Sequence, residues 1–431
     1  MATVLVTGGG GFLGSFVVSQ LRERGAELGV AKVKVLDVLS GVRGMTKDDD
    51  AAFKARCVDA WVVGSITDDE ALRRAVDGVD AIVHVASAVE TGTADPAVLR
   101  AVNVDGTRAL LAAAQAPWSK VRAVVYASSL DVLVANIFAD VDGETEDSLP
   151  YAVDAAPASH VERDVYSVTK TTAERDVLAC NGSRGRLLTA AVRPVGLFGP
   201  RDVVHLQAVL STARQAGSMH VFRIGAGDKV FQHAYVENVA WMLCLCAARL
   251  LQGDRAVAGQ AFMGIDDTKV CNFFDFFTVY LAALGYRVPT VHVPAALAWP
   301  AACLAEDCFR VARWLMPQRL RGAQLLFTRR AVHGTCVTQW FDTDKARRLL
   351  GYVPPVPPRL AHERTLAHVT AHYPRGPFVY PAGAFDTVSD DDDFRPSHPL
   401  YLAAVPHNKH RWRVLVLAAF GMALVVRFKV A

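Results

Sequence analysis

Four consecutive glycines, Gly8 to Gly11, stand near the start of the chain in the stretch TGGGGFLGS. Glycine costs the most backbone entropy on folding, so such a run indicates a tight turn or a close approach of backbone to a ligand. Residues 3–7 form a β-branched apolar run before it, and residues 14–24 follow with apolar side chains at helical spacing. A strand, a glycine turn and a helix N-terminus together favour a cradle for dinucleotide phosphates.

Asp37 is the acidic residue expected at the end of the second strand, residues 33–37. It follows Gly14 by roughly twenty residues, where a carboxylate accepts both hydroxyls of the adenosine ribose and repels a 2′-phosphate. NAD is therefore expected. NADP is the alternative cofactor, because Arg43 lies close to Asp37 in the sequence. A plain glycine-rich turn and a solvated acidic residue at a strand end are the alternatives.

Strand-like and helix-like stretches alternate through the first half of the chain. This rhythm predicts the α/β class, with a Rossmann-type doubly wound parallel sheet. The expected strands are residues 3–7, 33–37, 80–85, 122–127 and 188–193, and the expected helices are residues 14–24, 68–77, 97–116 and 166–180. Glycine and proline turns make the pattern less regular beyond residue 195. We expect residues 1–195 to form mainly an NAD(P)-binding domain and residues 196–376 a smaller substrate lobe.

Hydropathy is the unusual property of the composition. Apolar residues make up 52% of the 431 residues, and the mean hydropathy is +0.22, which is high for a soluble enzyme. The excess gathers at 291–317 in the substrate lobe and at 411–431, after a polar linker at 377–410. The run from Val414 to Val426 is shorter than the roughly twenty residues of a spanning helix. We predict a tail that associates with the membrane surface; a helix docked on the protein's own core is the alternative.

Charge and cysteine content narrow the class of protein. The net charge is +3 and no basic stripe alternates with aromatic residues, so nucleic acid is not an expected partner. The eight cysteines form no CxxC pair and no histidines join them at metal-ligand spacing. This indicates reduced thiols in a cytosol-facing protein without a metal site. No signal peptide is expected, because the first strand starts at residue 3.

Tyr166 and Lys170 stand four residues apart in a predicted helix, and so on one face of it. A tyrosine phenol titrates near pH 10, too high for a base at neutral pH. A lysine ammonium one turn away, together with the positive charge of an oxidised nicotinamide, favours the phenolate. The pair is therefore a candidate general base.

Three further polar residues are candidates near this pair. Ser128 and Ser129 follow the strand expected at 122–127, where either hydroxyl can hold a substrate oxygen beside Tyr166 or can simply cap a turn. Asn103 lies within an expected helix, where asparagine is a poor helix former. It can anchor a relay water, or it can bend the helix.

The segments TGGGGFLGS, HVAS, VNVDGT, YASS, YSVTK and RPVGLFGP occur in this order and resemble the extended short-chain dehydrogenase/reductase superfamily. Within it the chain is similar to the 3β-hydroxysteroid dehydrogenase family, whose members include decarboxylating dehydrogenases of 4-carboxysterols. Residues 341–368 resemble the closing segment of that family. The resemblance covers residues 2–373. Ser65 departs from it, since relatives often carry an acidic residue there that contacts adenine.

The resemblance implies a role for each candidate residue. Tyr166 would be the base, Lys170 its helper, Ser129 the hydroxyl on the substrate oxygen, with Ser128 as the alternative, and Asn103 the relay asparagine. The cofactor contacts that it implies are Gly8, Gly11, Phe12, Leu13, Gly14, Asp37, Ala86, Tyr166, Lys170 and Pro194.

The activity implied is NAD(P)-dependent oxidation of the 3β-hydroxyl of a sterol or steroid. A carboxylate on the neighbouring ring carbon would make the product a β-keto acid, which loses carbon dioxide through an enolate without a metal. A 3β-hydroxysteroid dehydrogenase/isomerase without decarboxylation is the nearest alternative. A nucleotide-sugar epimerase or a soluble plant-phenolic-type reductase leaves the apolar tail unexplained, and a non-catalytic relative typically loses Tyr166 or Lys170. Membrane association at the endoplasmic reticulum is expected. A homodimer is one of the oligomeric states that the sequence allows.

Overall fold

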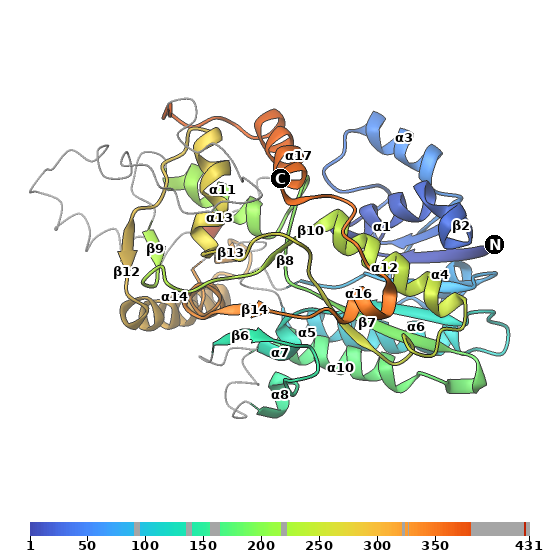
Figure 1. Cartoon of the computed structure of the whole chain (residues 1–431). Helices are drawn as coiled ribbons and strands as arrows, with labels where there is room; N and C mark the ends of the chain where they lie inside the picture. Colours follow the sequence, from blue (N-terminus) through green and yellow to red (C-terminus); the bar gives the residue numbers. More distant parts are fainter. Residues whose placement is uncertain are drawn as a thin grey trace, which may run out of the picture.

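The computed structural model describes residues 1–89, 95–134, 140–155, 164–216, 222–320, 324–325, 327–380 and 426–427. At its centre lies a seven-stranded sheet in the order β11-β7-β5-β4-β1-β2-β3, whose neighbouring strands are all parallel (Figure 1). These strands are β1 (Ala2–Thr7), β2 (Val30–Asp37), β3 (Ala60–Val63), β4 (Ala81–His84), β5 (Ala123–Ala127), β7 (Leu188–Pro194) and β11 (Ala261–Gly264). The strand order reverses between β1 and β4, which confirms the doubly wound α/β fold.

Helices cover both faces of the sheet. Alternate residues of β1 divide the core: Val4 and Val6 pack with α1 and α12 on one face, and Leu5 packs with α4, α6 and α10 on the other. The helices of the sheet region are α1 (Phe12–Glu23), α2 (Gly25–Leu28), α3 (Lys47–Cys57), α4 (Asp69–Val76), α5 (Pro96–Arg100), α6 (Thr107–Ala114), α7 (Asp131–Val134), α8 (Ala152–Ala155), α10 (Val165–Ala179), the 3₁₀ turn Ser183–Gly185 and α12 (Val236–Leu251).

The five expected strands and three of the four expected helices are present at or close to their predicted residues. The fourth helix, expected over 97–116, is divided: the π-helical turn Ala101–Gly106 separates α5 from α6. Strands β3 and β11 of the sheet, which have four residues each, were not predicted.

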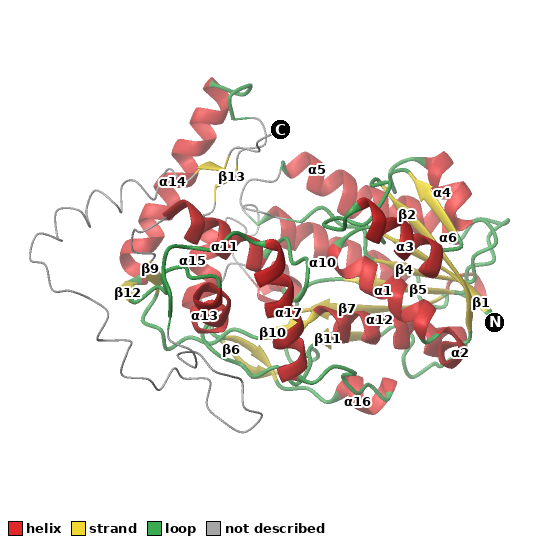
Figure 2. Ribbon diagram, turned by 90° about the horizontal axis from the view of Figure 1, so that it is seen from above, coloured by secondary structure: helices red, strands yellow, loops and turns green. Residues whose placement is uncertain are grey.

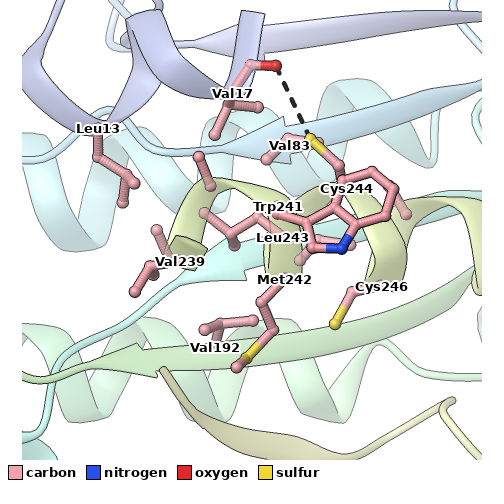
Figure 3. Packing of buried hydrophobic residues seen from close by; sticks show 14 of the residues in the cluster. Leu13, Val17, Val83, Val192, Val239, Trp241, Met242, Leu243, Cys244 and Cys246 are labelled. Atoms are coloured by element: carbon pink, nitrogen blue, oxygen red, sulfur yellow. Dashed lines mark hydrogen bonds between the residues drawn. The ribbon is translucent and has the colours of Figure 1, made fainter. Parts of the chain in front are cut away.

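Residues beyond 195 contribute to the sheet layer as well as to the lobe. Strand β11 extends the sheet next to β7, and α12 packs against α1. The Cys244 thiol of α12 lies 3.7 Å from the Val17 carbonyl oxygen of α1 and donates to it (Figure 3). The division at residue 195 remains a proposal, and the two parts that it separates share this core.

Most of the other described elements lie to one side of the sheet, whereas α16 packs beside α12 and β11 (Figure 1, Figure 2). Helices α11 and α13 pack with α17 around Phe198 in an aromatic-rich cluster, and α14 packs against α15. The helices are α11 (His205–Ala216), α13 (Phe273–Ala283), α14 (Ala295–Leu315), α15 (Arg329–Cys336), α16 (Lys345–Leu350) and α17 (Pro358–His372). The paired strands are β6 (Val141–Glu144) with β14 (Gln339–Phe341), β8 (Gly196–Phe198) with β10 (His233–Tyr235), β9 (Phe222–Ile224) with β12 (Val291–Val293), and β13 (Gln324–Leu325) with β15 (Val426–Arg427).

The predicted tail at 411–431 and most of the linker at 377–410 lie outside the described residues. The exception in the tail is β15, whose backbone pairs antiparallel with β13. Within the described parts of the chain, every helix is too short or too polar to cross a membrane.

Helix α1 approaches the glycine turn so closely that Gly14 has no room for a side chain. A Cβ atom on Gly14 would lie 2.0 Å from the Gly8 carbonyl oxygen. Gly8 itself has a φ of +73°, which favours glycine, and a Cβ atom there would lie 2.7 Å from the Ala86 backbone nitrogen. The turn therefore packs closely against both α1 and the chain that follows β4.

We predict that Gly14→Ala lowers the free energy of unfolding by about 3 kcal/mol, the upper end of the usual overpacking cost. Helix propensity alone would favour alanine by about 1 kcal/mol, so the steric contact decides the sign. Gly334→Ala in α15 is the control, because a Cβ atom there meets nothing within 4 Å. Urea denaturation measures both variants. Equal stabilities of Gly14→Ala and the unaltered protein would contradict this account of the turn.

Candidate active site

The glycine turn leaves the first amides of α1 facing outward without a side-chain cap. Gly11 precedes the helix in an extended conformation, and its amide donates to the Gly8 carbonyl oxygen at 3.0 Å. Uncapped amides at a helix N-terminus carry partial positive charge and bind anions. Phe12 and Leu13 form the first turn, at the carboxyl edge of the sheet where doubly wound folds bind ligands. The turn therefore fits a pyrophosphate.

Asp37 lies beside this turn at the end of β2. Its carboxylate oxygens accept hydrogen bonds from the Gly10 amide and the Leu39 amide, both at 2.8 Å. A carboxylate oxygen can accept more than one hydrogen bond, so the group retains acceptors for a ribose hydroxyl. Arg43 is exposed, and its backbone amide donates to the Gly10 carbonyl oxygen at 2.9 Å.

His84 links the glycine turn to the π-helical turn through a buried chain of hydrogen bonds. Thr107 donates from its hydroxyl to the Asn103 carbonyl oxygen at 2.7 Å, so it accepts from His84 Nε2 at 3.0 Å. His84 Nδ1 then accepts from the Thr7 hydroxyl at 2.7 Å, and Thr7 accepts from the Ala86 amide at 3.3 Å. Burial, followed by the charge of Lys170, lowers the pKa of His84 to about 3 and keeps the ring neutral.

Asn103 anchors the loop after β4 to helix α10. Its Oδ1 accepts from the Ala88 amide at 2.8 Å and from the Ser87 hydroxyl at 3.0 Å. Its Nδ2 donates to the Ala88 carbonyl oxygen at 3.0 Å and to the Thr169 hydroxyl at 3.1 Å. An asparagine side chain makes four hydrogen bonds, so protein partners occupy all of them. The relay role stays a proposal that requires one of these bonds to open.

Lys170 lies one turn after Tyr166 on α10, and both side chains are buried. Its ammonium donates to the Ala127 carbonyl oxygen at 2.7 Å and to the Ser87 hydroxyl at 3.5 Å. Burial lowers the pKa of Lys170 to about 7, although the carboxylates of Glu174 and Asp131 oppose the shift. The group therefore titrates near neutral pH.

Ser129, rather than Ser128, makes the hydrogen bond with Tyr166. The Ser129 hydroxyl also donates to Asp131 Oδ2 at 2.7 Å. The Ser128 hydroxyl is buried and has no partner among the described residues. The Ser129 turn is tied to Pro194 at the end of β7, because the Leu130 amide donates to the Pro194 carbonyl oxygen at 3.0 Å.

The charges around Tyr166 differ from the sequence expectation. Burial raises the pKa of the Tyr166 phenol, and the nearby Asp131 carboxylate raises it further. Arg330 and the hydrogen bond with Ser129 act in the opposite direction. The expected depression by Lys170 and an oxidised nicotinamide is thus not present in the protein alone, since burial outweighs the charges that the chain supplies.

Three groups of this site were missed from the sequence. His84 ends an apolar strand and looks like a core residue, and Asp131 looks like an ordinary turn residue after the serines. Arg330 lies 164 positions after Tyr166, so no local pattern connects the two. The only available signal for His84 was its place in HVAS, just before the small residues.

Comparisons with known proteins identify the family of the chain. A profile of the 3-beta hydroxysteroid dehydrogenase/isomerase family matches residues 5–295. The sterol-4-alpha-carboxylate 3-dehydrogenase, decarboxylating, of Mus musculus is 32% identical over 363 residues, covering 84% of this chain and 89% of the relative. The 3-beta-hydroxysteroid dehydrogenase of Mycolicibacterium neoaurum is 30% identical over 361 residues, covering 82% and 87%.

Solved structures share the fold at lower identity. The dTDP-glucose 4,6-dehydratase DesIV of Streptomyces venezuelae, solved with NAD and TYD bound, has a TM-score of 0.61 and 22% identity, covering 86% of this chain and 97% of that chain. UDP-glucuronic acid 4-epimerase of Bacillus cereus, solved with NAD and a substrate analogue, has a TM-score of 0.61 and 16% identity, covering 86% and 100%.

The family profile and the relatives, one of them a short-chain dehydrogenase/reductase of Mus musculus at 30% identity, identify the chain as an extended short-chain dehydrogenase/reductase, a class of oxidoreductases, and the parallel sheet agrees with this. Within that class, the chain belongs to the 3-beta hydroxysteroid dehydrogenase/isomerase family. Both levels of the resemblance seen in the sequence are confirmed.

The shifted pKa of Lys170 predicts a pH-dependent contribution to stability. The pKa falls from 10.5 in the unfolded chain to about 7 in the folded protein. Between these values the unfolded chain binds more protons, so the free energy of unfolding rises with pH. We expect the unaltered protein to gain several kcal/mol relative to Lys170→Met across this window.

Urea denaturation at a series of pH values, without added nucleotide, measures this difference. Lys120→Met is the matched control, because the Lys120 side chain is exposed to solvent. A difference between the unaltered protein and Lys170→Met that stays constant with pH would show that the ammonium is not buried as described.

Proposed function

We propose that this protein is an NAD-dependent dehydrogenase that oxidises the 3β-hydroxyl of a sterol. The observation that carries the proposal is the convergence of Tyr166, Lys170 and Ser129 beside the glycine turn. A phenol, an ammonium and a hydroxyl at the carboxyl edge of a parallel sheet suit proton removal from a secondary alcohol. The names of the sterol and steroid dehydrogenases among the relatives support the substrate class.

The residues present fit NAD at both ends. The glycine turn and the first amides of α1 would hold the pyrophosphate, and Asp37 would accept the ribose hydroxyls and disfavour a 2′-phosphate. Ala86 and Pro194 would line the site from the ends of β4 and β7. When bound, the oxidised nicotinamide supplies a hydride acceptor and a positive charge.

Tyr166 would take the proton from the substrate hydroxyl. Lys170 would stabilise the phenolate one turn away and hold the nicotinamide ribose. The Ser129 hydroxyl, which donates to Asp131 in this structure, can rotate to donate to the substrate oxygen as the carbonyl forms. Asn103 would keep the loop after β4 against α10.

Decarboxylation would follow when the carbon next to the hydroxyl carries a carboxylate. Oxidation then gives a β-keto acid, which loses carbon dioxide as its electrons form an enolate, and Ser129 and Tyr166 would stabilise the enolate oxygen. The relative named as a decarboxylating sterol dehydrogenase favours this step. The family description also names isomerases, so a 3β-hydroxysteroid dehydrogenase/isomerase is the second candidate.

The surface of α14 supports a membrane location. Its inward face carries Ala298, Ala302, Ala305 and Phe309, while its outward face carries larger apolar side chains. The exposed ones on α14 and just after it are Leu297, Leu304, Val311, Trp314, Leu315 and Met316. Such a patch marks an interaction surface. In both views α14 lies on the opposite side of the molecule from the N-terminus (Figure 1, Figure 2).

Positively charged side chains near this patch favour contact with an anionic lipid surface. Arg310, Arg313 and Arg319 are exposed beside the apolar residues, and Trp314 is 79% exposed. Basic and aromatic side chains favour the headgroup region of anionic membranes. We therefore propose that α14, together with the C-terminal tail, rests on a membrane, with the endoplasmic reticulum as the expected location. A homodimer stays a prediction from the sequence.

We predict that the purified protein with NAD converts a 4-carboxysterol bearing a 3β-hydroxyl into a 3-ketosterol that has lost carbon dioxide. Mass spectrometry of the products measures both changes. NADP should support a slower reaction, because the Asp37 carboxylate would repel a 2′-phosphate. The same sterol without the carboxylate is the control. Oxidation of the control alone would favour a plain 3β-hydroxysteroid dehydrogenase, and no reaction of either sterol would contradict the proposal.

Tyr166→Phe removes the proposed base and leaves the glycine turn untouched. We expect turnover to fall by a factor of roughly 10² to 10⁴, the usual contribution of general base catalysis, with NAD affinity unchanged. Steady-state kinetics and calorimetric titration with NAD measure the two effects. An unchanged turnover would remove Tyr166 from the mechanism.

Membrane binding is tested by sedimentation with vesicles that contain anionic phospholipid. We expect deletion of residues 405–431 to weaken binding and Leu304→Glu with Trp314→Glu to abolish the remainder, because charges replace the apolar face of α14. Val353→Glu is the control, since Val353 is exposed away from α14. Undiminished binding of the combined variant would show that neither segment holds the protein on the membrane.

A further inference from the structure

Helix α15 contributes an arginine to the site from the C-terminal part of the chain. Arg330 lies beyond residues 5–295, the part that matches the family profile. Its Nη2 atom lies 2.6 Å from Asp131 Oδ2, and its Nη1 atom lies 3.3 Å from Asp164 Oδ1. One guanidinium therefore bridges two carboxylates from different elements of the site.

Each of these carboxylates holds part of the catalytic apparatus. The Asp131 oxygen that pairs with Arg330 also accepts from the Ser129 hydroxyl. Asp164 is the N-cap of α10 and accepts from the Ser167 amide at 3.2 Å and from the Ser167 hydroxyl at 2.6 Å. Arg330 thus fixes the Ser129 turn relative to the start of the helix that carries Tyr166.

Arg330 also lies over the Tyr166 ring. Its guanidinium carbon is 5.1 Å from the ring centroid, within the range of a cation–π contact. Its own helix is anchored at the N-terminus, directly before this residue. The Thr328 hydroxyl caps α15 by accepting from the Ala331 amide at 3.1 Å, and Arg329 forms ion pairs with Glu306 and Asp307 of α14.

The charged and titratable groups that face Tyr166 come from four parts of the fold. Asp164 and Lys170 belong to α10 and its cap, while Tyr126 comes from β5 and Asp131 from the start of α7. Arg330 is the positive charge from α15. It opposes the two carboxylates, which together would disfavour the phenolate that the base must form.

We propose that Arg330 is a positioning residue for the oxidation. It fixes Ser129 and Tyr166 relative to each other through Asp131 and Asp164, and its positive charge offsets the two carboxylates beside the phenol. This inference rests on the proposed function, because it assigns Arg330 a role in the reaction of that site. A guanidinium suits the task, since its planar fork can serve two carboxylates at once.

The test compares Arg330→Met and Arg330→Lys with the unaltered enzyme in sterol oxidation with NAD. Loss of the cation should raise the pKa of Tyr166, so the rising limb of kcat/KM should move to higher pH in Arg330→Met. We expect a shift of at least one pH unit and a loss of about tenfold in kcat/KM at neutral pH, since one unit changes the phenolate fraction tenfold. Arg330→Lys should show a smaller pH shift than Arg330→Met, because it keeps the charge.

Asp131→Asn provides a readout of opposite sign. It removes an anion beside Tyr166, so the rising limb should move to lower pH, even though turnover falls as the ion pair with Arg330 is lost. Arg108→Met is the matched control: it removes an exposed ion pair of 2.7 Å with Asp176 on α10, away from Tyr166. This variant should leave both the pH profile and kcat unchanged.

Nuclear magnetic resonance separates this inference from the proposed function. Carbon-13-labelled tyrosine in the NAD complex, with Tyr166 assigned through Tyr166→Phe, reports the ionisation of the phenol whatever the substrate. An unaltered enzyme that is inactive on sterols would overturn the function, while a Tyr166 titration displaced upward in Arg330→Met would still support the inference. A titration and pH profile that do not move in folded Arg330→Met would overturn it.

Discussion

The contact of helix α1 with the glycine turn is the constraint on which the rest of the structure depends. Because Gly14 lies against the Gly8 carbonyl oxygen, the helix begins directly over the carboxyl end of β1. Gly8 in turn lies against the backbone of Ala86 at the end of β4. The glycine turn is thereby held between α1 and the end of β4, at the point where the strand order reverses. The uncapped amides of α1 lie at the same edge of the sheet as the candidate residues Tyr166, Lys170 and Ser129.

Buried hydrogen bonds connect the glycine turn to the candidate active-site residues. Thr7 binds His84, His84 binds Thr107, and the π-helical turn that holds Asn103 follows directly. Buried polar groups are costly without partners, so such a chain is stable in only a few arrangements. Together with Asn103, it fixes the loop after β4 against α10, where the Lys170 ammonium donates to the Ser87 hydroxyl of that loop.

The sequence allowed a good prediction of what depends on local spacing. The glycines, Asp37, Tyr166 and Lys170 were found because short intervals place them on a turn, at a strand end and on one helix face. The π-helical turn at Asn103 was not predicted, since an extra residue in a helix leaves the apolar pattern almost unchanged. Arg330 could not be found, because its contacts with Asp131 and Asp164 join distant parts of the chain. Tertiary packing alone brings that charge to Tyr166.

The central claim is that this edge of the sheet transfers a hydride from a sterol carbon to NAD. The most direct test uses a 4-carboxysterol with deuterium on the carbon that bears the 3β-hydroxyl. After reaction with NAD, the account predicts deuterium in the reduced nicotinamide and a 3-ketosterol without it. Deuterium that remains in the sterol, as transient oxidation by an epimerase would leave it, or that appears in water would contradict the account.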